Sequence, residues 1–583
     1  MDAISVESAT ATVPEQELVP ITANQRIEAL DVVRGFALLG IFLMNIEYFN
    51  RTLSSLGQGM PRGLTGIDWL ASWFIAYFVQ GKFWTIFSLL FGMGFAVMMT
   101  RAAQAGREFM IVYLRRVLAL AVFGAAHFVL LWEGDILFSY AIAALMLMIV
   151  LYGKTIPLLI GIAIAVGVAF IPGWGNVAAV AIGLAAAGLL AIHLRRKPLT
   201  IRRHAVPLFS LLVLVIGTLL CVAAAVFWLL PDGPIEPRLP LSLFGPLLVI
   251  AGWLSWKYYE PAEKRTVRLA IGIYVFLGIA ITAGGLIQRF GPDPDAGVVV
   301  AAQKPTNGEA RVDVTVAEKA APDADKKVEK KTKQERAVER KAAREKRLAE
   351  AKAKNEKEQR IFTSGSYWEA VKWRSGRFPE KAADDFGFGI VLVGMFLLGT
   401  WFVRSGVMEN TPAHLPFFRK LAVYGLPVGI GVGLLGSLIA MSHTPDDRYD
   451  GWGIAVGLSI IGNLPACLGY VGLVVLMLHS NTVFSRISVL GPPGRMALTN
   501  YLAQSLISAT FFYGYAMGQW GMPRAQQVLF VVVVYAAQTV FSHWWLSRFH
   551  YGPMEWLWRG FTYGQMPQLL RHRLRADGDP AST

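Results

Sequence analysis

Three polar side chains share one face of the first long apolar segment, and their types can bind a phosphate group or polarise a carbonyl. Asp31, Arg34 and Asn45 fall on one side of an ideal helix, which turns about 100° per residue. Arg34 and Asn45 are about 16 Å apart along such a helix, and Arg26 precedes them. The spacing indicates a polar stripe from one mouth of a membrane helix toward the other leaflet. The alternative is a simple ion pair between Asp31 and Arg34 at a helix end.

A histidine and a carboxylate occur close together in the stretch "HFVLLWEGDIL". Arg115 and Arg116 begin a predicted helix, and His127 follows about 17 Å further along it. Gly134 breaks that helix, and Asp135 is suited to cap the next one. A histidine oriented by a carboxylate can act as a general base on a hydroxyl or an amine. The alternative is a packed histidine that bonds a backbone carbonyl, beside an aspartate that only caps a helix.

Two polar clusters nearer the C-terminus complete the set of candidate site residues. They lie in "GRMALTNYLAQS" and "GPMEWLWRGF" and comprise Arg495, Asn500, Tyr501, Gln504, Glu555 and Arg559. Trp and Arg in a short helix are typical of an amphipathic segment at the membrane surface; a lid, or a site next to a nucleotide, is the alternative. The small residues in "SLLFGMG" (88–94) allow close helix packing, either for stability or as one wall of a ligand channel.

The composition indicates a membrane protein. Of the 583 residues, 54% are apolar, only 16% are charged, and the mean hydropathy is +0.46, whereas a soluble protein has about 25% charged residues. Apolar runs of about 20 residues, long enough to cross a bilayer as helices, recur along the chain. Only helices or closed barrels satisfy every backbone group in lipid, and the alternating segments of a barrel are not visible. We therefore predict an all-α, polytopic bundle of about 14 crossings in the cell inner membrane.

The charge distribution predicts the topology. The net charge of +15 is assigned to basic loops on the cytoplasmic side, so no nucleic-acid partner is expected. These loops place both termini in the cytoplasm if residues 67–80 form an interfacial or re-entrant segment on the outer face. Cys221 and Cys467 lie in apolar stretches and are expected to be packed thiols. No metal and no tightly bound cofactor is predicted, and the acidic N-terminal segment does not match a cleaved signal peptide.

The chain divides by composition into five parts. They are a disordered cytoplasmic tail (1–25), an N-terminal transmembrane block (26–290), a charged helical or disordered insertion on the periplasmic side (291–386), a C-terminal transmembrane domain (387–565) and a basic cytoplasmic tail (566–583). The insertion is rich in Lys, Glu, Arg and Ala with many oppositely charged i,i+4 pairs, and no apolar stripe is visible in it. We therefore expect it to be solvated.

Five stretches in this order resemble the YeiB-like bacterial inner-membrane proteins. They are "RIEALDVVRGFALLGIFLMNIEYF", "KFWTIFSLLFGMGFA", "RRVLALAVFGAAHFVLLWEGDILFSYAI", "GRMALTNYLAQS" and "GPMEWLWRGFTY". The C-terminal part of that family is classed as domain of unknown function 418. The N-terminal block is more distantly similar to the heparan-α-glucosaminide N-acetyltransferases, in which an Arg-x-x-x-(Leu/Val)-Asp-x-x-Arg-Gly stretch also opens the first helix of the catalytic bundle.

The second resemblance implies transfer of an acyl group from cytoplasmic acyl-CoA, with acetyl-CoA as one candidate, to a carbohydrate or lipid acceptor across the membrane. The residues implied for binding the CoA are Arg26, Asp31, Arg34, Arg115 and Arg116. In the implied chemistry His127 acts as base, Asp135 orients it and Asn45 donates to the oxyanion. The related lysosomal enzymes carry their histidine in the loop after the first helix. Residues 50–81 contain no histidine here, so His127 is the nearest substitute.

Two other classes of function stay open at this point. The first is a transporter or flippase for a small polar or lipid-linked solute, although transporters often show internal repeats and none is evident by eye. The second is a non-catalytic membrane assembly protein that binds an envelope partner through the charged insertion. The expected partners are membrane lipids and, for the enzyme, an envelope carbohydrate; a homodimer is left open.

Overall fold

The predicted class is confirmed by the computed structural model, which describes residues 27–104, 109–201, 204–230, 238–291, 333–445, 447 and 449–571. Within these residues, 11 helices are long and apolar enough to cross a membrane, and two shorter apolar helices accompany them. These 13 helices compare with the expected number of about 14 crossings. The described strands, β1 (Leu199–Ile201) and β2 (His204–Val206), form one short antiparallel pair. The chain is therefore a multi-pass, all-α membrane protein.

The helices of the first half follow one another with short connections. In chain order they are α1 (Glu28–Asn45), η2 (Ile46–Phe49), η3 (Leu53–Ser55), α2 (Gly66–Phe74), η4 (Ile75–Val79), α3 (Lys82–Gln104), α4 (Met110–Ala126), η5 (His127–Leu131), α5 (Leu137–Tyr152), α6 (Thr155–Ala169), η6 (Gly175–Val177), α7 (Ala178–Arg195), α8 (Leu208–Leu229), α9 (Arg238–Lys257), η7 (Ala262–Lys264) and α10 (Arg265–Phe290).

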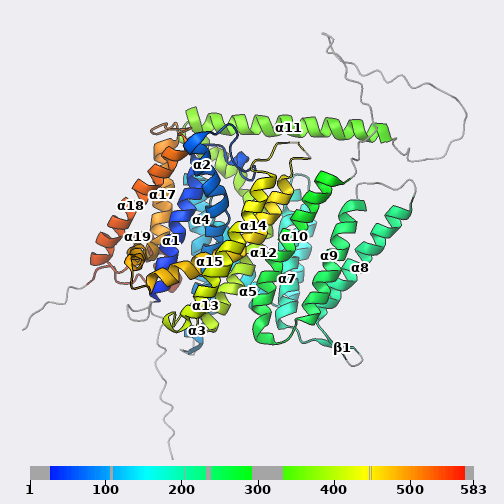
Figure 1. Cartoon of the computed structure of the whole chain (residues 1–583), viewed down its shortest axis with the longest axis horizontal. Helices are drawn as coiled ribbons and strands as arrows, with labels where there is room; N and C mark the ends of the chain where they lie inside the picture. The colour runs from blue at the N-terminus through cyan, green and yellow to red at the C-terminus, as the bar shows by residue number, and fades with distance from the viewer. Residues whose placement is uncertain are drawn as a thin grey trace, which may run out of the picture.

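The second half begins with two long helices. Its described helices are α11 (Lys333–Ser364), α12 (Tyr367–Arg404), η8 (Pro412–His414), α13 (Leu415–Lys420), η9 (Leu421–Gly425), α14 (Leu426–Ile439), α15 (Trp452–Leu478), η10 (Val483–Leu490), α16 (Gly491–Arg495), α17 (Ala497–Phe512), α18 (Arg524–Arg548) and α19 (Pro553–Tyr563). Figure 1 shows most long helices side by side, with α11 lying across one end of the bundle and α8 and α9 at its edge.

Both predicted transmembrane blocks contribute to one bundle. Helix α12 packs against α3, α5 and α10, and α15 packs against α10 and α14. The centre is formed by α3 and α12, which approach closely because each has a glycine at the crossing. A Cβ on Gly92 would lie 2.2 Å from the carbonyl oxygen of Phe396, and one on Gly399 would lie 2.2 Å from that of Leu89. Close packing of small residues, expected for the 88–94 stretch, is therefore present at Gly92.

Helix α12 runs through the expected boundary between residues 386 and 387. This helix begins at Tyr367, where Ser366 and Glu369 form a capping box. Its first half is charged, yet Arg374 and Asp385 are buried in the bundle. These charged side chains can be buried because they bind groups of η5 and α5: Arg374 binds carbonyls of η5, and Asp385 binds Ser139. The expected solvated character does hold for the described part of α11, whose side chains are mostly exposed.

The end of α11 is tied to the loop that follows α1. The Glu358 side chain is 1% exposed and accepts hydrogen bonds from the backbone of Leu53 and Ser54. The C-terminal end of α11 therefore lies at the same end of the bundle as the C-terminal end of α1, as the predicted topology requires. Helix α1 begins at the opposite end of the bundle (Figure 1). Which end faces the cytoplasm stays a prediction.

The segment at 67–80 forms α2 and η4, which end before α3 begins. The chain breaks its helical course at Gln80, which has an extended ψ of 134°, and at Gly81, which has a φ of +83°. Only glycine adopts that φ at no steric cost. Asp68 accepts a hydrogen bond from the backbone of Ala525 at 2.8 Å, which fixes α2 against the start of α18. The re-entrant assignment stays a prediction.

The α3–α12 crossing yields a stability prediction. Gly399→Ala should lower the free energy of unfolding by about 1–3 kcal/mol, because the added methyl group meets backbone atoms that cannot rotate away. Gly387→Ala, on the same helix, is the matched control, since its Cβ would meet nothing within 4 Å. Thermal unfolding of the two purified variants in one detergent tests this. Equal midpoints would contradict the proposed contact.

Candidate functional site

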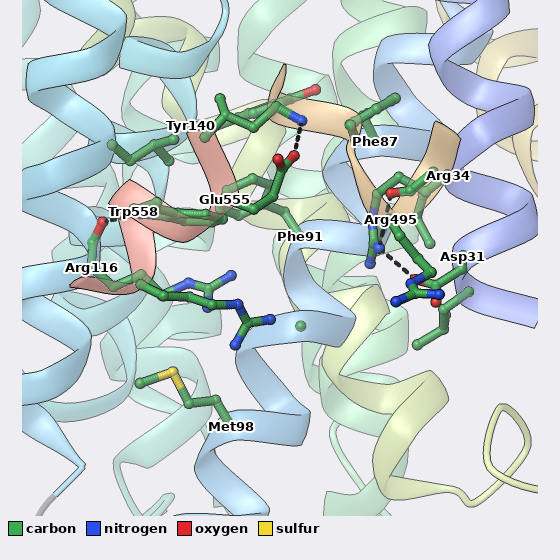
Figure 2. Close-up of a pocket in the computed structure, with 18 of the residues that line it drawn as sticks. Asp31, Arg34, Phe87, Phe91, Met98, Arg116, Tyr140, Arg495, Glu555 and Trp558 are labelled. Atoms are coloured by element: carbon green, nitrogen blue, oxygen red, sulfur yellow. Dashed lines mark hydrogen bonds and ion pairs between the residues drawn. The ribbon is translucent and has the colours of Figure 1, made fainter. Parts of the chain in front are cut away.

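A cavity of about 330 Å³ lies among α1, α3, α4, α5, α16, α17 and α19. Its walls are largely apolar, with Phe87, Leu90 and Phe91 among them. The charged residues that line it are Asp31, Arg34, Arg101, Arg116, Arg495, Glu555 and Arg559. Figure 2 shows Asp31, Arg34 and Arg495 gathered on one side, with Arg116, Glu555 and Trp558 on the other. The cavity thus joins three clusters that are far apart in the sequence.

The α1 wall contains the predicted charged pair. Arg34 Nη1 lies 2.8 Å from Asp31 Oδ1 and also donates to the carbonyl of Gly494 at 3.4 Å. The Asp31–Arg34 ion pair, which was the alternative to a binding site, is therefore present, and both of its residues also line the cavity. Backbone contact between α1 and α16 brings Arg495 close, because a Cβ on Gly494 would lie 1.9 Å from the carbonyl oxygen of Asp31. Arg26 lies outside the described residues.

Helix α19 closes the opposite wall with aromatic and charged side chains. The guanidinium carbon of Arg116 lies 4.1 Å from the ring centroid of Trp558, and Trp558 Nε1 donates to the Arg116 carbonyl at 3.1 Å. Arg559 stacks on Tyr551 at 4.6 Å. Arg115, although adjacent in sequence, is exposed and does not line the cavity. One turn of α4 therefore presents one of the two predicted arginines, because the second points to another face.

Glu555 has a structural contact that explains its place. Its carboxylate accepts hydrogen bonds from the backbone N–H groups of Leu498 and Thr499 at 2.7 and 3.1 Å. These N–H groups belong to the first turn of α17 and have no partner within the helix. Burial raises the pKa of Glu555. This side chain fastens α19 to α17 and so holds the cavity wall in place.

The other predicted polar residues of α17 divide between two faces. Tyr501 lines the cavity. Asn500 and Gln504 do not; Asn500 donates to Ser542 at 3.0 Å and Gln504 donates to Gln538 at 2.9 Å. They connect α17 to α18 as buried pairs. The cluster predicted from sequence is therefore partly a site and partly a helix–helix contact.

The predicted histidine–aspartate pair is present. His127 Nδ1 lies 2.8 Å from Asp135 Oδ1, and both side chains are fully buried. The other carboxylate oxygen accepts the backbone N–H of Phe138 at 2.7 Å, so Asp135 also caps the start of α5. Among the described residues, His127 Nε2 has no hydrogen-bond partner. If Nδ1 carries the proton toward the carboxylate, Nε2 presents an unused lone pair, as a general base must.

One aromatic ring separates this pair from the cavity. The ring centroids of His127 and Tyr501 are 5.1 Å apart, and Tyr501 faces the cavity. Ile136 and Leu137, which directly follow Asp135, also line it. The cavity therefore reaches the neighbourhood of the pair but not the histidine itself.

Asn45 is not brought to this place. It lies half-buried at the junction of α1 and η2, does not line the cavity, and no hydrogen bond in the described structure joins it to His127 or Asp135. Helical spacing predicts Asn45 and Arg34 on one face of α1, but the part of that face that lines the cavity does not extend to Asn45. The next cavity residues come from α5 and α17 instead.

Sequence reasoning missed a charged stripe on α12. Its members are Arg374, Arg377, Lys381 and Asp385, at the i, i+3, i+7 and i+11 spacing of one helix face. This face contacts η5 and α5, the elements on either side of Asp135. The spacing was a usable signal, but the surrounding charge led to the solvated assignment. Arg101, from the last turn of α3, was also missed as a cavity residue.

The connection between η5 and α5 yields a pH prediction. Burial and the neighbouring Glu358 carboxylate raise the pKa of Glu133 from 4.5 to about 8. The folded chain therefore holds a proton that the unfolded chain releases, so the free energy of unfolding falls as the pH rises through this interval. Glu133→Gln should flatten this fall, measured as the thermal midpoint between about pH 5 and about pH 8.

The control for this measurement is Glu263→Gln, which changes an exposed glutamate in η7. Its pH profile should match that of the parent chain. A Glu133→Gln profile that also matches the parent would contradict the raised pKa.

Comparison with known proteins identifies the family region. Residues 402–565 match the family model described as "Protein of unknown function (DUF418)". The chain is 25% identical to "Uncharacterized protein YxaH" of Bacillus subtilis (strain 168), over 94% of this chain and 96% of that protein. It is 33% identical to "Uncharacterized protein YeiB" of Escherichia coli (strain K12), over 30% of this chain and 45% of that protein.

A third relative is similar over a shorter stretch. The "Uncharacterized 39.9 kDa protein in amylase 3'region" of Bacillus acidopullulyticus is 41% identical over 22% of this chain and 35% of its own length. No solved structure matches the chain. The family region covers α17 to α19, so one wall of the cavity belongs to it. The chain is a YeiB-like protein with a C-terminal DUF418 region.

Proposed function

We propose that the chain is an integral membrane acyltransferase that moves an acyl group from acyl-CoA to a hydroxyl or amine of an envelope carbohydrate or lipid. The observation that supports this most is the arginine-lined cavity, whose inner wall is one ring away from the His127–Asp135 pair. A cavity that binds an anion and approaches a general base has the two parts that acyl transfer needs.

The charge of the cavity favours a phosphorylated ligand. Five arginines line it against two acids. Asp31 is engaged by Arg34, and Glu555 by backbone N–H groups. Guanidinium groups bind phosphate oxygens through paired hydrogen bonds, and apolar walls strengthen that attraction by excluding water. The phosphates of CoA suit the arginines, and an acyl-pantetheine arm suits the apolar interior.

The proposed reaction assigns each nearby group one role. His127 Nε2 takes the proton of the acceptor hydroxyl or amine while the acceptor atom attacks the thioester carbonyl. The new bond to the acceptor forms, the C–S bond breaks, and the proton passes from His127 to the departing thiolate. Asp135 keeps the ring oriented and stabilises its charged form. Tyr501 has to turn aside for the thioester to reach Nε2.

The proposed location is the cell inner membrane, with the arginine end of the cavity toward the cytoplasm. The basic loops favour this orientation, and cytoplasmic acyl-CoA would then enter at Arg34 and Arg116. The opposite end, where Glu358 fastens α11, would face the periplasm together with the acceptor.

A transporter for an anionic solute is the second candidate, and one observation favours it. Lys82 lies at the start of α3 and is only 1% exposed, and an ionisable side chain at membrane depth is often functional. Asn463 of α15 lies against the neighbouring Gly81, and its Oδ1 has no hydrogen-bond partner among the described residues. The tests below separate this candidate from the enzyme.

The first prediction concerns ligand binding. Acetyl-CoA should raise the thermal midpoint of the purified chain, because a ligand that binds the folded state stabilises it by mass action. Arg116→Ala and Arg34→Ala should abolish the shift. Arg115→Ala is the matched control, because Arg115 is adjacent to Arg116 and does not line the cavity. Loss of the shift in the Arg115 variant as well, or no shift in the parent chain, would refute acyl-CoA binding in this cavity.

The second prediction concerns the reaction. His127→Ala should reduce incorporation of labelled acetyl groups from acetyl-CoA into envelope material of membrane vesicles by about 10²- to 10⁴-fold. His543→Ala is the control, because that histidine is exposed and its Nε2 donates to the Val489 carbonyl at 3.0 Å. Full activity of the His127 variant would exclude the assigned base. Solute flux that needs no acyl-CoA and is lost in Lys82→Met would favour the transporter.

A further inference from the structure

Arg374 is a fully buried arginine far from the cavity in sequence. Its side chain is 0% exposed, and all three of its nitrogen atoms donate to carbonyl oxygens. Nε donates to Val129 at 2.9 Å, Nη2 to Leu130 at 3.1 Å and Nη1 to Leu131 at 2.8 Å. No carboxylate is needed to explain its burial, because three consecutive backbone groups share the guanidinium.

These carbonyls belong to the turn that begins with His127. The last carbonyls of a helix have no partner within it, and η5 ends at Leu131. A π-helical bond from the N–H of Trp132 to the carbonyl of His127, 2.9 Å long, closes this turn. The rigid planar fork of an arginine can bind adjacent carbonyls in a fixed arrangement, which a flexible lysine cannot reproduce. The Arg374 guanidinium therefore binds the last three carbonyls of η5 in one fixed arrangement.

The same face of α12 holds the chain on the other side of the turn. Arg377 Nη1 lies 2.9 Å from Glu133 Oε2. Further along, Asp385 accepts a hydrogen bond from Ser139 at 2.8 Å, and Lys381 lies 2.6 Å from the Asp385 carboxylate. The segment from residue 127 to 139 is thus held at three places by one helix.

Asp135 lies between these places, so its approach to His127 depends on them. The two side chains are eight residues apart, and their 2.8 Å contact requires that η5 stop after Leu131 and that the chain reverse within residues 132–136. Gly134 permits the reversal, since a Cβ there would lie 2.3 Å from the ring of Trp132. The guanidinium of Arg374 stabilises this reversal at its first step.

We propose that Arg374 is a positioning residue for the His127–Asp135 pair, acting through the carbonyl groups of residues 129–131. The catalytic meaning of this role rests on the proposed acyl transfer. The geometric part does not, because the position of the histidine can be measured without any reaction.

Histidine labelling with diethyl pyrocarbonate, read by mass spectrometry on the full chain in lipid nanodiscs, tests the geometric part. In the parent chain His127 and His193, which are 2% and 6% exposed, should both be protected. Arg374→Ala should speed labelling of His127 at least about tenfold, because local opening exposes it, and leave His193 protected. Arg374→Lys should fall between the two.

The matched control is Arg524→Ala, which removes another buried arginine, 3% exposed, that binds Gln527 and Glu47. It should leave His127 protected. The proposal is overturned if His127 stays protected in Arg374→Ala, or if Arg524→Ala exposes it equally. If Arg374→Ala unfolds, Arg374→Lys decides: His127 labelled alone supports positioning, and His127 and His193 labelled together overturn it.

Kinetics test the catalytic part separately. Arg374→Lys should lower kcat for acetyl transfer by up to about 100-fold, the cost of a small misplacement of a reacting group. KM for acetyl-CoA should not change, because Arg374 does not line the cavity. Equal changes in kcat and KM would indicate a general structural defect and overturn the catalytic role. Absence of transfer in the parent chain would refute the proposed function, whereas the labelling result would still decide the positioning role.

Discussion

A charged side chain that is buried in this bundle is stabilised by partners inside the protein, because lipid offers none. The charged face of α12 shows the consequence most clearly. Arg374 binds three carbonyls, Arg377 binds Glu133, and Lys381 binds Asp385. These contacts hold the connection between η5 and α5. That connection contains Asp135 and places it against His127. The position of the His127–Asp135 pair is thus linked to a helix that contributes no residue to the cavity wall.

The cavity depends on a second requirement, the close approach of helix backbones. Gly494 meets the backbone of α1, and Gly92 and Gly399 bring α3 and α12 together. The contact at Gly494 brings Arg495 of α16 next to the wall that carries Arg34. Close backbone contact at glycine therefore contributes to a bundle in which arginines from five helices, α1, α3, α4, α16 and α19, line one cavity.

The arginine-lined cavity and the His127–Asp135 pair are separate, and the ring of Tyr501 lies between them. Tyr501 faces the cavity and packs on His127, so its position controls whether the two parts communicate. Glu555 caps the first turn of α17, the helix that carries Tyr501. Much of this wall is in the family region at residues 402–565. In this arrangement the DUF418 region supplies one wall of the cavity and the Tyr501 ring, and the N-terminal helices supply the His127–Asp135 pair and most of the charged lining.

The sequence alone determined the class of the protein, the position of its spans and several local pairs. Hydropathy is a property of each segment, so the helices could be predicted from composition. The Asp31–Arg34 contact and the capping role of Asp135 were also predictable, because both depend on residues within about one turn. The pairing of His127 with Asp135 was predicted from the chemistry of the two residue types. Their separation of eight residues is too long for local helix geometry to confirm the contact.

Only the tertiary structure decided which polar side chains line the cavity. It placed Arg116 there and Arg115 outside, turned Asn500 and Gln504 toward α18, and left Asn45 apart from the histidine. It also showed that charged residues in the first half of α12, which were expected to be solvated, are buried in the bundle. The physical reason is common to all these cases: whether a charge is solvated or buried depends on partners far away in the chain, such as the carbonyls of residues 129–131 for Arg374. Local spacing identifies a face of a helix, but only packing decides what that face meets.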